Sequence, residues 1–248
     1  MYLVARPEAQ ARDLIQLLAT NGVAAKYLPL MATEIKPVNL ATALAQINSC
    51  DGVFFSSPLA IDYVAKDLST IKPSCRIFSA GASSAKRLLD LGVACVNYPA
   101  GGSGISALIS AKLLLKYSLH SLAIVGGDQV NPQLASYLNY EKITFKFIDL
   151  YQRSNLGLAN LNLFAKLINE SSIVGIIITS TLLARYLSDC CRKLNLGARL
   201  AQLALLSLHP QITQYLTQQG FSKVYETATA DNRAILTLIR KLHDERKN

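Results

Sequence analysis

The sequence has 248 residues, of which 51% are hydrophobic, and its 25 lysines and arginines against 16 aspartates and glutamates give a formal charge of +9. The longest unbroken apolar stretch, near residues 173–178, is far shorter than the ~20 residues that a membrane helix needs, so we expect no membrane partner and a core of buried strands. The five cysteines are odd in number and lack C-x-x-C spacing, which argues against a disulfide framework and a thiolate metal cage.

The positive charge favours an anionic ligand such as a nucleic acid, a phosphate or a polycarboxylate, because it raises the local concentration of anions. The basic residues are dispersed, except for a run over residues 240–247 that we interpret as a solvated helix end. No RNP or zinc-finger signature occurs, so we expect no nucleic-acid partner. Residues 1–5 lead directly to Arg6 and Pro7 without a basic and apolar leader, which predicts a cytoplasmic protein.

Apolar strand-like runs alternate with helical patterns along the whole chain. Such alternation predicts βαβ units and parallel sheets, and the continuous apolarity of residues 176–178 indicates a strand covered on both faces. The expected fold class is therefore α/β, with doubly wound parallel sheets; length alone leaves one or two domains open. The strand-like runs are residues 3–5, 52–55, 76–78, 122–125, 173–178 and 202–206.

Three blocks of the sequence recur in the same order, which predicts two copies of one fold. The shifts between the paired blocks are 120, 123 and 128, so they grow only by small insertions. The alternative, that the blocks are alike without a duplication, stays open, because strand-turn-helix units share a generic pattern. The paired blocks are 3–30 with 123–150, 54–64 with 177–187, and 79–92 with 207–220.

Hydroxyl side chains follow the apolar strand in the second block of both copies. Ser56 and Ser57 stand there in the first copy, and Thr179 and Ser180 in the second. Side chains and backbone N–H groups just past the carboxyl ends of parallel strands face the crevice in which α/β proteins bind ligands. Serine and threonine before a helix are also ordinary N-caps, so each pair has a structural interpretation as well.

The motifs of common cofactor sites are absent from the sequence. No G-x-G-x-x-G follows the first strand and no P-loop occurs, while the glycine cluster at residues 101–104 fits either an anion contact or a plain turn. His120, His209 and His243 lack metal-ligand spacing and the context of a catalytic triad. We therefore expect neither a cofactor nor a metal. His209 aligns with Gly81 of the first copy, at a helix start that could face the crevice.

Short motifs stand along the chain in a fixed order. They are Ala5-Arg6-Pro7, residues 55–61, residues 80–88, Tyr151-Gln152-Arg153, Thr179-Ser180, residues 207–212 and residues 230–232. In order and spacing they resemble the T-R-P, F-T-S-P-x-A-V, V-G-x-x-T-A-x-x-L, Y-Q-R, T-S, S-x-H-P-x-I and A-D-N of the uroporphyrinogen-III synthase family, over nearly the full chain.

The resemblance implies two similar α/β domains joined by two extended linkers, with a cleft between them. One domain would comprise residues 1–30 with 154–248 and the other residues 36–149, while residues 31–35 and 150–153 would be the linkers. The N-terminal strand and helix would then fold with the C-terminal half, so the boundary of the duplication and the boundary of the domains differ.

The resemblance also implies the reaction. The substrate would be hydroxymethylbilane, a linear tetrapyrrole with eight carboxylates, which loses its terminal hydroxyl to give an azafulvenium and closes through a spiro-pyrrolenine with inversion of ring D. Pyrrole electrons drive each step, so the family needs no cofactor. The protein would act as a monomer that orients the substrate, and hydroxymethylbilane synthase would be its transient partner.

Site residues follow from the same resemblance. Tyr151 would be the general acid that assists loss of the hydroxyl, and Arg6 would supply a charge-assisted contact to a carboxylate. Both residues also have a structural interpretation: Tyr151 as a tyrosine packed in a linker, and Arg6 as a surface charge. The remaining substrate-binding residues would be Ser56, Ser57, Gly81, Ser84, Ser103, Thr179, Ser180 and His209.

The sequence departs from the family pattern at two places. Ala5 replaces the threonine of T-R-P, and the arginine- and glycine-rich turn after the fourth strand, commonly R-G-x-x-G-R, has no arginine over residues 126–133. The second departure favours the rival interpretation, a non-catalytic two-domain binding protein for an anionic metabolite. A third interpretation, a basic domain associated with nucleic acid, predicts binding that weakens steeply with salt.

Overall fold

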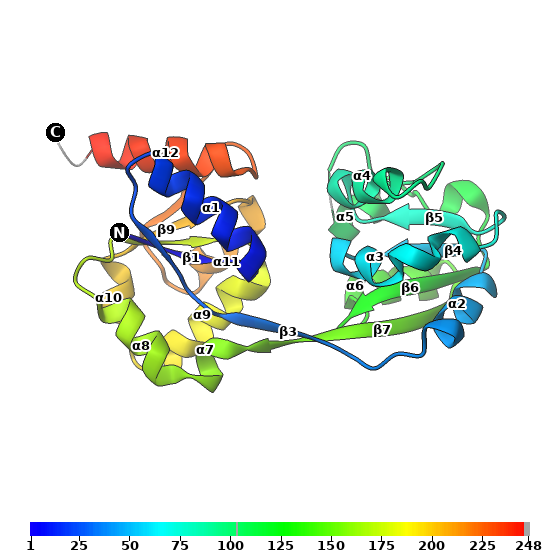
Figure 1. Ribbon diagram of the computed structural model, residues 1–248, viewed down its shortest axis with the longest axis horizontal. Coiled ribbons are helices and arrows are strands. Elements are labelled where there is room, and N and C mark those ends of the chain that lie inside the picture. The colour runs from blue at the N-terminus through cyan, green and yellow to red at the C-terminus, as the bar shows by residue number, and fades with distance from the viewer. Residues whose placement is uncertain (103, 246–248) are drawn as a thin grey trace. The chain divides into compact units, whose positions relative to one another are not determined.

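The computed structural model describes residues 1–102 and 104–245, and it divides the chain into two compact units (Figure 1). Unit 1 comprises Met1–Ala32 with Ser154–Asn248, and unit 2 comprises Thr33–Arg153. Within the described residues, every helix is too short or too polar to cross a membrane. Ser103, which the sequence predicts as a substrate-binding residue, lies outside the described residues.

Unit 1 contains a five-stranded parallel sheet in the order β10-β9-β8-β1-β2. Its strands are β1 (Tyr2–Ala5), β2 (Ala25–Tyr27), β8 (Gly175–Ile178), β9 (Ala204–Ser207) and β10 (Val224–Glu226). The helices are α1 (Glu8–Thr20), α7 (Leu156–Ala159), α8 (Leu161–Asn169), α9 (Thr181–Lys193), α10 (Gly197–Ala201), α11 (Pro210–Gln218) and α12 (Asn232–Asp244).

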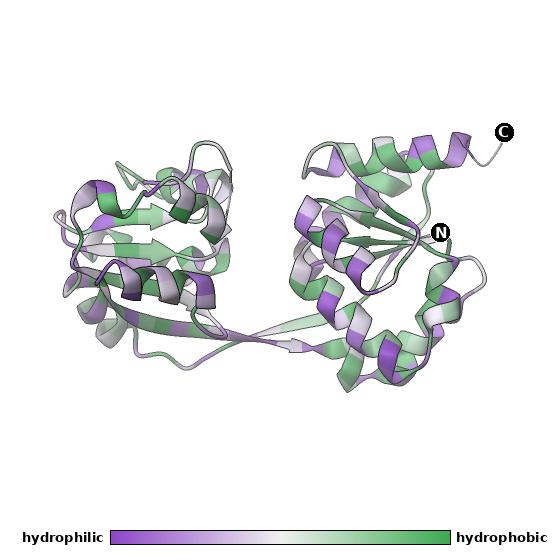
Figure 2. Ribbon diagram, turned by 180° about the vertical axis from the view of Figure 1, so that it is seen from behind, coloured by the Kyte–Doolittle hydropathy of each residue, from purple (hydrophilic) through white to green (hydrophobic). Residues whose placement is uncertain are grey.

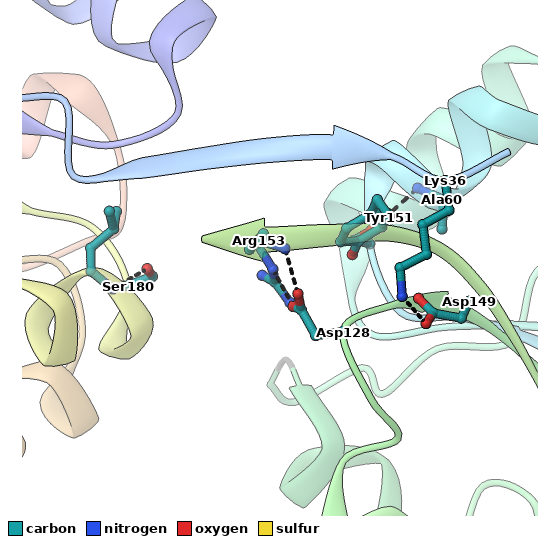
Figure 3. Close-up of polar contacts among 9 residues, drawn as sticks. Lys36, Ala60, Asp128, Asp149, Tyr151, Arg153 and Ser180 are labelled. Carbon is teal, nitrogen blue, oxygen red and sulfur yellow. Dashed lines mark hydrogen bonds and ion pairs between the residues drawn. The ribbon is translucent and has the colours of Figure 1, made fainter. Parts of the chain in front are cut away.

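Unit 2 contains a second five-stranded sheet, in the order β3-β7-β6-β4-β5. Strands β4 to β7 are parallel, whereas β3 and β7 point in opposite directions (Figure 3). The strands are β3 (Met31–Ile35), β4 (Gly52–Phe55), β5 (Arg76–Ser79), β6 (Ser121–Gly127) and β7 (Thr144–Asn155). The helices are α2 (Leu40–Asn48), α3 (Pro58–Val64), η1 (Ala65–Thr70), α4 (Ala82–Asp90), α5 (Gly104–Ser110), η2 (Leu115–Tyr117) and α6 (Pro132–Tyr140).

Both sheets are covered by helices on two faces, so the predicted doubly wound α/β fold is confirmed. Successive strand residues enter different core clusters: Leu3 packs with α8, α9 and α11, whereas Val4 packs with α1 and α12. In unit 2, Val53 and Phe54 divide between two clusters in the same way. The central strands of both sheets are accordingly mostly hydrophobic (Figure 2).

The two sheets pair in the register that the internal repeat predicts. Residues related by the shifts of 120, 123 and 128 occupy equivalent places in the two sheets. Each strand of the first copy therefore pairs with the same neighbours as its counterpart in the second copy. The duplication is therefore a property of the fold and not only of the sequence. The equivalent pairs are Val4–Tyr27 and Ile124–Phe147, Val4–Ile177 and Ile124–Phe54, and Ile177–Leu206 and Phe54–Phe78.

Local details differ from the regular pattern at three places. Helix α5 ends at Ser110, because Lys112 has a left-handed φ of 47° that a helix does not tolerate. The strand predicted from Ile173 begins only at Gly175, although Ile173 is buried in the core. The five cysteines are free thiols, of which Cys95 is exposed and the other four are buried.

Asp51 joins the start of β4 to the start of β6. Its carboxylate accepts hydrogen bonds from the His120 and Ser121 backbone N–H groups, both 2.9 Å, and from the Ser121 hydroxyl at 3.0 Å. The His120 contact is the largest cause that lowers the pKa of Asp51, followed by the two contacts of Ser121. A lowered carboxyl pKa means that the folded state prefers the ionised group.

We expect Asp51→Ala to lower the free energy of unfolding by about 2 kcal/mol at neutral pH, since backbone donors lose a charged acceptor. The contribution is present above the ordinary carboxyl pKa and is lost as the pH falls through the lower pKa of the folded state. Urea unfolding at neutral and acidic pH measures it, with Asp51→Asn as the variant that keeps the shape and removes the charge. A deficit that stays constant with pH would contradict this role.

Candidate active site at the carboxyl ends of the strands

Each sheet has a point at which the strand order reverses. In unit 1 it lies between β1 and β8, and in unit 2 between β6 and β4, because the chain proceeds outward from each pair in opposite directions. Ligands of open α/β sheets bind just beyond the carboxyl ends of such strands. The residues in these places are Arg6 and Thr179 in unit 1, and Ser56 and Gly126 in unit 2.

Gly126 is close to Ser56 at the carboxyl edge of unit 2. A Cβ atom on Gly126 would lie 2.2 Å from Ser56 Oγ, so any side chain there would displace the serine. Ser56 is exposed, and its N–H donates to the Val125 carbonyl at 3.0 Å. Ser56 therefore takes the space that a side chain at Gly126 would need. This edge offers a hydroxyl beside a turn, residues 126–133, that contains no arginine.

Ser57 and Tyr151 form a hydroxyl pair in the same unit. Ser57 Oγ accepts from the Ala60 N–H at 3.2 Å, which makes it the N-cap of α3, and it lies 2.9 Å from Tyr151 Oη. Tyr151 is only 3% exposed. Its ring lies over the backbone of Gly127, where a Cβ would approach the ring to 2.1 Å. The sequence placed Tyr151 in a linker, whereas the structure places it inside the long strand β7.

The turn after β6 holds Arg153 through Asp128. One carboxylate oxygen of Asp128 accepts from the Arg153 backbone N–H and the other from its Nε, both at 2.6 Å (Figure 3). The Arg153 guanidinium also lies 5.4 Å from the centre of the Tyr151 ring. Neither Asp128 nor Arg153 was among the predicted site residues, although Arg153 closes the Y-Q-R motif and Asp128 lies in the altered turn.

Ser180 and Thr179 occupy the equivalent edge of unit 1. Ser180 Oγ accepts from the Leu183 N–H at 3.3 Å and caps α9, as Ser57 caps α3 in the other copy. Thr179 Oγ1 donates to the Ala5 carbonyl at 3.4 Å, and both hydroxyl residues are half-buried. The N-cap interpretation therefore holds for Ser57 and Ser180. Of the four hydroxyl residues in the two turns, Ser56 and Thr179 are the two that do not cap a helix.

Arg6 provides the guanidinium at this edge. Its Nη1 donates to Asn232 Oδ1 at 2.7 Å, while its Nε is buried and has no hydrogen-bond partner in the part of the chain that the structure describes. Burial lowers the pKa of Arg6, and the charge of Asp13 partly offsets that effect. An unpaired buried N–H on a cation is costly unless a ligand accepts from it. Sequence reasoning missed Asn232 as a site residue, although it ends the A-D-N motif that was recognised.

The other predicted residues lie at equivalent helix starts. His209 is exposed and caps α11, since its Nδ1 accepts from the Gln211 N–H at 3.2 Å. Gly81 precedes α4 at the equivalent place and is buried. Ser84 is 4% exposed within α4, which makes it the least accessible of the predicted serine and threonine residues in the described part of the chain.

The groups at each edge suit recognition of carboxylates. In unit 1, Arg6 contributes a charged donor, Thr179 a hydroxyl and the N-terminus of α9 backbone N–H groups, and in unit 2 Ser56 contributes a hydroxyl. Tyr151 is the phenol that could release a proton. Across residues 1–102 and 104–245, no group of three or more His, Cys, Asp or Glu side chains gathers to hold a metal ion.

Comparisons with known proteins agree on one family. The family described as Uroporphyrinogen-III synthase HemD matches residues 12–237. A mutant uroporphyrinogen III synthase from the extremely thermophilic bacterium Thermus thermophilus superposes with a TM-score of 0.69 at 16% identity, over 98% of both chains. The uroporphyrinogen-III synthetase of Helicobacter pylori 26695 gives a TM-score of 0.58 at 17% identity, over 97% of this chain and 98% of its own. Among curated proteins, none matches the sequence.

Proposed function

The chain belongs to the uroporphyrinogen-III synthase family, and we propose that the carboxyl edges of both its sheets bind the carboxylates of hydroxymethylbilane. The activity of the family is the closure of this linear tetrapyrrole to uroporphyrinogen III, a cyclising lyase reaction of porphyrin and haem biosynthesis. The substrate carries eight carboxylates, so it requires many donors in fixed places. The chain supplies these as hydroxyls, helix N-termini and one guanidinium.

The buried Nε–H of Arg6 is the observation that carries this proposal. It lies at the strand-order reversal of unit 1, next in sequence to the end of β1, and it has no acceptor among residues 1–102 and 104–245. Asn232 fixes the other side of the guanidinium by accepting from Nη1. A carboxylate that reached the guanidinium would neutralise its charge, and Nε, which has almost no accessible surface, would donate to it once the side chain turned.

Tyr151 is the proposed proton donor. As the pyrrole nitrogen pushes its electron pair toward the terminal carbon, the carbon–oxygen bond breaks, and the hydroxyl takes the proton of Tyr151 and leaves as water. The resulting azafulvenium is then attacked by ring D, and the proton released when the macrocycle regains aromaticity returns to the phenolate. Ser57, 2.9 Å from the phenol oxygen, can exchange donor and acceptor roles with it and so transmit the proton.

Gly81, Ser84, Ser103, Ser180 and His209 stay predictions as substrate contacts. It also stays a prediction that the protein is a monomer, that it acts in the cytoplasm and that it binds no nucleic acid. Transient contact with hydroxymethylbilane synthase is likewise a prediction. That contact would hand over the bilane before it closes spontaneously.

Thr179→Ala tests the hydroxyl at the edge of unit 1. We expect a rise in KM of about 10-fold with kcat little changed, because a hydrogen bond from a hydroxyl to a charged carboxylate is worth about 1.5 kcal/mol, at the low end for charged partners. Steady-state kinetics with freshly made hydroxymethylbilane measures it, and Thr179→Ser, which keeps the hydroxyl, is the matched control. Unchanged KM in the alanine variant would remove Thr179 from the binding set.

Complementation separates the proposed enzyme from a binding protein. A bacterial strain that lacks its own uroporphyrinogen-III synthase should grow without added haem when it expresses this chain. A binding protein that captures an anionic metabolite would leave the strain dependent on haem. Growth failure despite confirmed expression of folded protein would favour that rival.

A further inference from the structure

We infer that Asp128 is a positioning residue for Tyr151, and that it acts by holding the Arg153 guanidinium against the tyrosine ring. This inference rests on the proposed role of Tyr151 as proton donor and extends it to two residues that do not touch the reacting atoms. It gives a function to a residue of the turn at residues 126–133, where the sequence departs most from the family pattern.

The geometry of Asp128 differs from that of a surface ion pair. Its backbone has a left-handed φ of 66°, and its N–H donates to the Tyr151 carbonyl at 2.8 Å. Its carboxylate at the same time accepts from two nitrogens of Arg153. Asp128 thus fixes the backbone on both sides of Gln152 and the direction of the arginine side chain with three hydrogen bonds.

The register of the sheet explains why one residue can do this. Gly126 pairs with Asp149, but Gly127 pairs with Tyr151, so β7 contains an irregularity that skips Leu150. The irregularity turns Tyr151 toward Gly127, whose missing side chain admits the ring. Bulges of this kind commonly re-aim a side chain next to an active site.

The electrostatics give the arrangement a chemical consequence. A guanidinium within about 6 Å of an aromatic ring centre interacts favourably with its face, and Arg153 lies at 5.4 Å. As Tyr151 gives up its proton, negative charge develops on the ring, and the nearby cation stabilises it. Asp128 keeps the cation there and prevents it from pairing with a substrate carboxylate instead.

The test compares Asp128→Asn with wild type. Asparagine tolerates the left-handed backbone and keeps one oxygen for the Arg153 N–H, but it removes the charge that holds Nε. We expect kcat to fall about fivefold while KM stays within about twofold. Asp90→Asn, which breaks the exposed Lys86–Asp90 pair on α4, is the matched control and should change neither constant.

Two further measurements separate positioning from general stabilisation. In the Tyr151→Phe background, Asp128→Asn should cause no further loss of kcat, because the group through which it acts is gone. In protein labelled with [13Cζ]tyrosine, the Tyr151 resonance, assigned among the 11 tyrosines by its absence in Tyr151→Phe, should move in Asp128→Asn but not in Asp90→Asn.

An additive loss of kcat in the double variant, or an unmoved resonance, would overturn the inference. Failure of the proposed function would look different, because the wild-type protein would then form no uroporphyrinogen III, or Tyr151→Phe would keep full turnover. The resonance would still report in that case whether Asp128 sets the surroundings of Tyr151.

Discussion

Tyr151→Phe should lower kcat by about 10²-fold, at the lower end of the contribution expected from a positioned general acid. The phenyl ring keeps its place over Gly127 and against Arg153, so only the proton and the contact to Ser57 are lost. KM should stay within about twofold, since the buried ring does not bind the carboxylates. Steady-state rates of uroporphyrinogen III formation measure both constants.

Tyr63→Phe is the matched control for this variant. Tyr63 lies in α3 of the same unit and donates its hydroxyl proton to the Val38 carbonyl at 3.3 Å, away from the strand ends. Its loss should leave kcat unchanged. If Tyr151→Phe kept normal turnover, or raised KM and left kcat intact, the hydroxyl would not be the proton donor.

Arg6→Ala should raise KM between about 10-fold and 10²-fold, because a hydrogen bond to a charged group contributes about 1.5–3 kcal/mol. The effect on kcat should be smaller, as the contact exists before and during the reaction. Asn232→Ala should change KM in the same direction by less, since the cation remains but loses the acceptor that orients it. Isothermal titration calorimetry with the product uroporphyrinogen III provides an independent measure of the loss of affinity.

Arg6→Lys distinguishes charge from geometry. Lysine keeps the positive charge but replaces the planar fork with a single ammonium, so it should recover only part of the affinity. Full recovery would mean that charge alone matters at this position. An unchanged KM in Arg6→Ala, with stability confirmed by unfolding, would show that the buried Nε does not meet the substrate.

Much of the fold was predictable because buried parallel strands have a strong local signature. Gly52–Phe55 is observed with the predicted bounds, and the other five predicted strands differ by a few residues at their ends. The short edge strand β10 has only three residues, none of them buried, so it left no apolar run to detect. The end of α5 depends on the backbone of Lys112, which residue type does not reveal.

The site was harder to predict because its partners come from distant parts of the chain. The hydroxyl turns could be found, since each follows a strand in both copies of the repeat. The Arg6–Asn232 contact spans 226 residues, and the Ser57–Tyr151 contact spans 94. Asp128 gave no signal of its own, because only the folded turn shows that it holds Arg153.

The isomer composition of the product shows whether this chain directs closure of the bilane. Porphobilinogen and hydroxymethylbilane synthase supply the bilane, the protein is added, and the uroporphyrins are separated after oxidation. We expect predominant isomer III, which increases with protein concentration and is absent with heat-denatured protein. Isomer I alone, the product of spontaneous closure, would contradict it, because the chain would then bind without directing ring D.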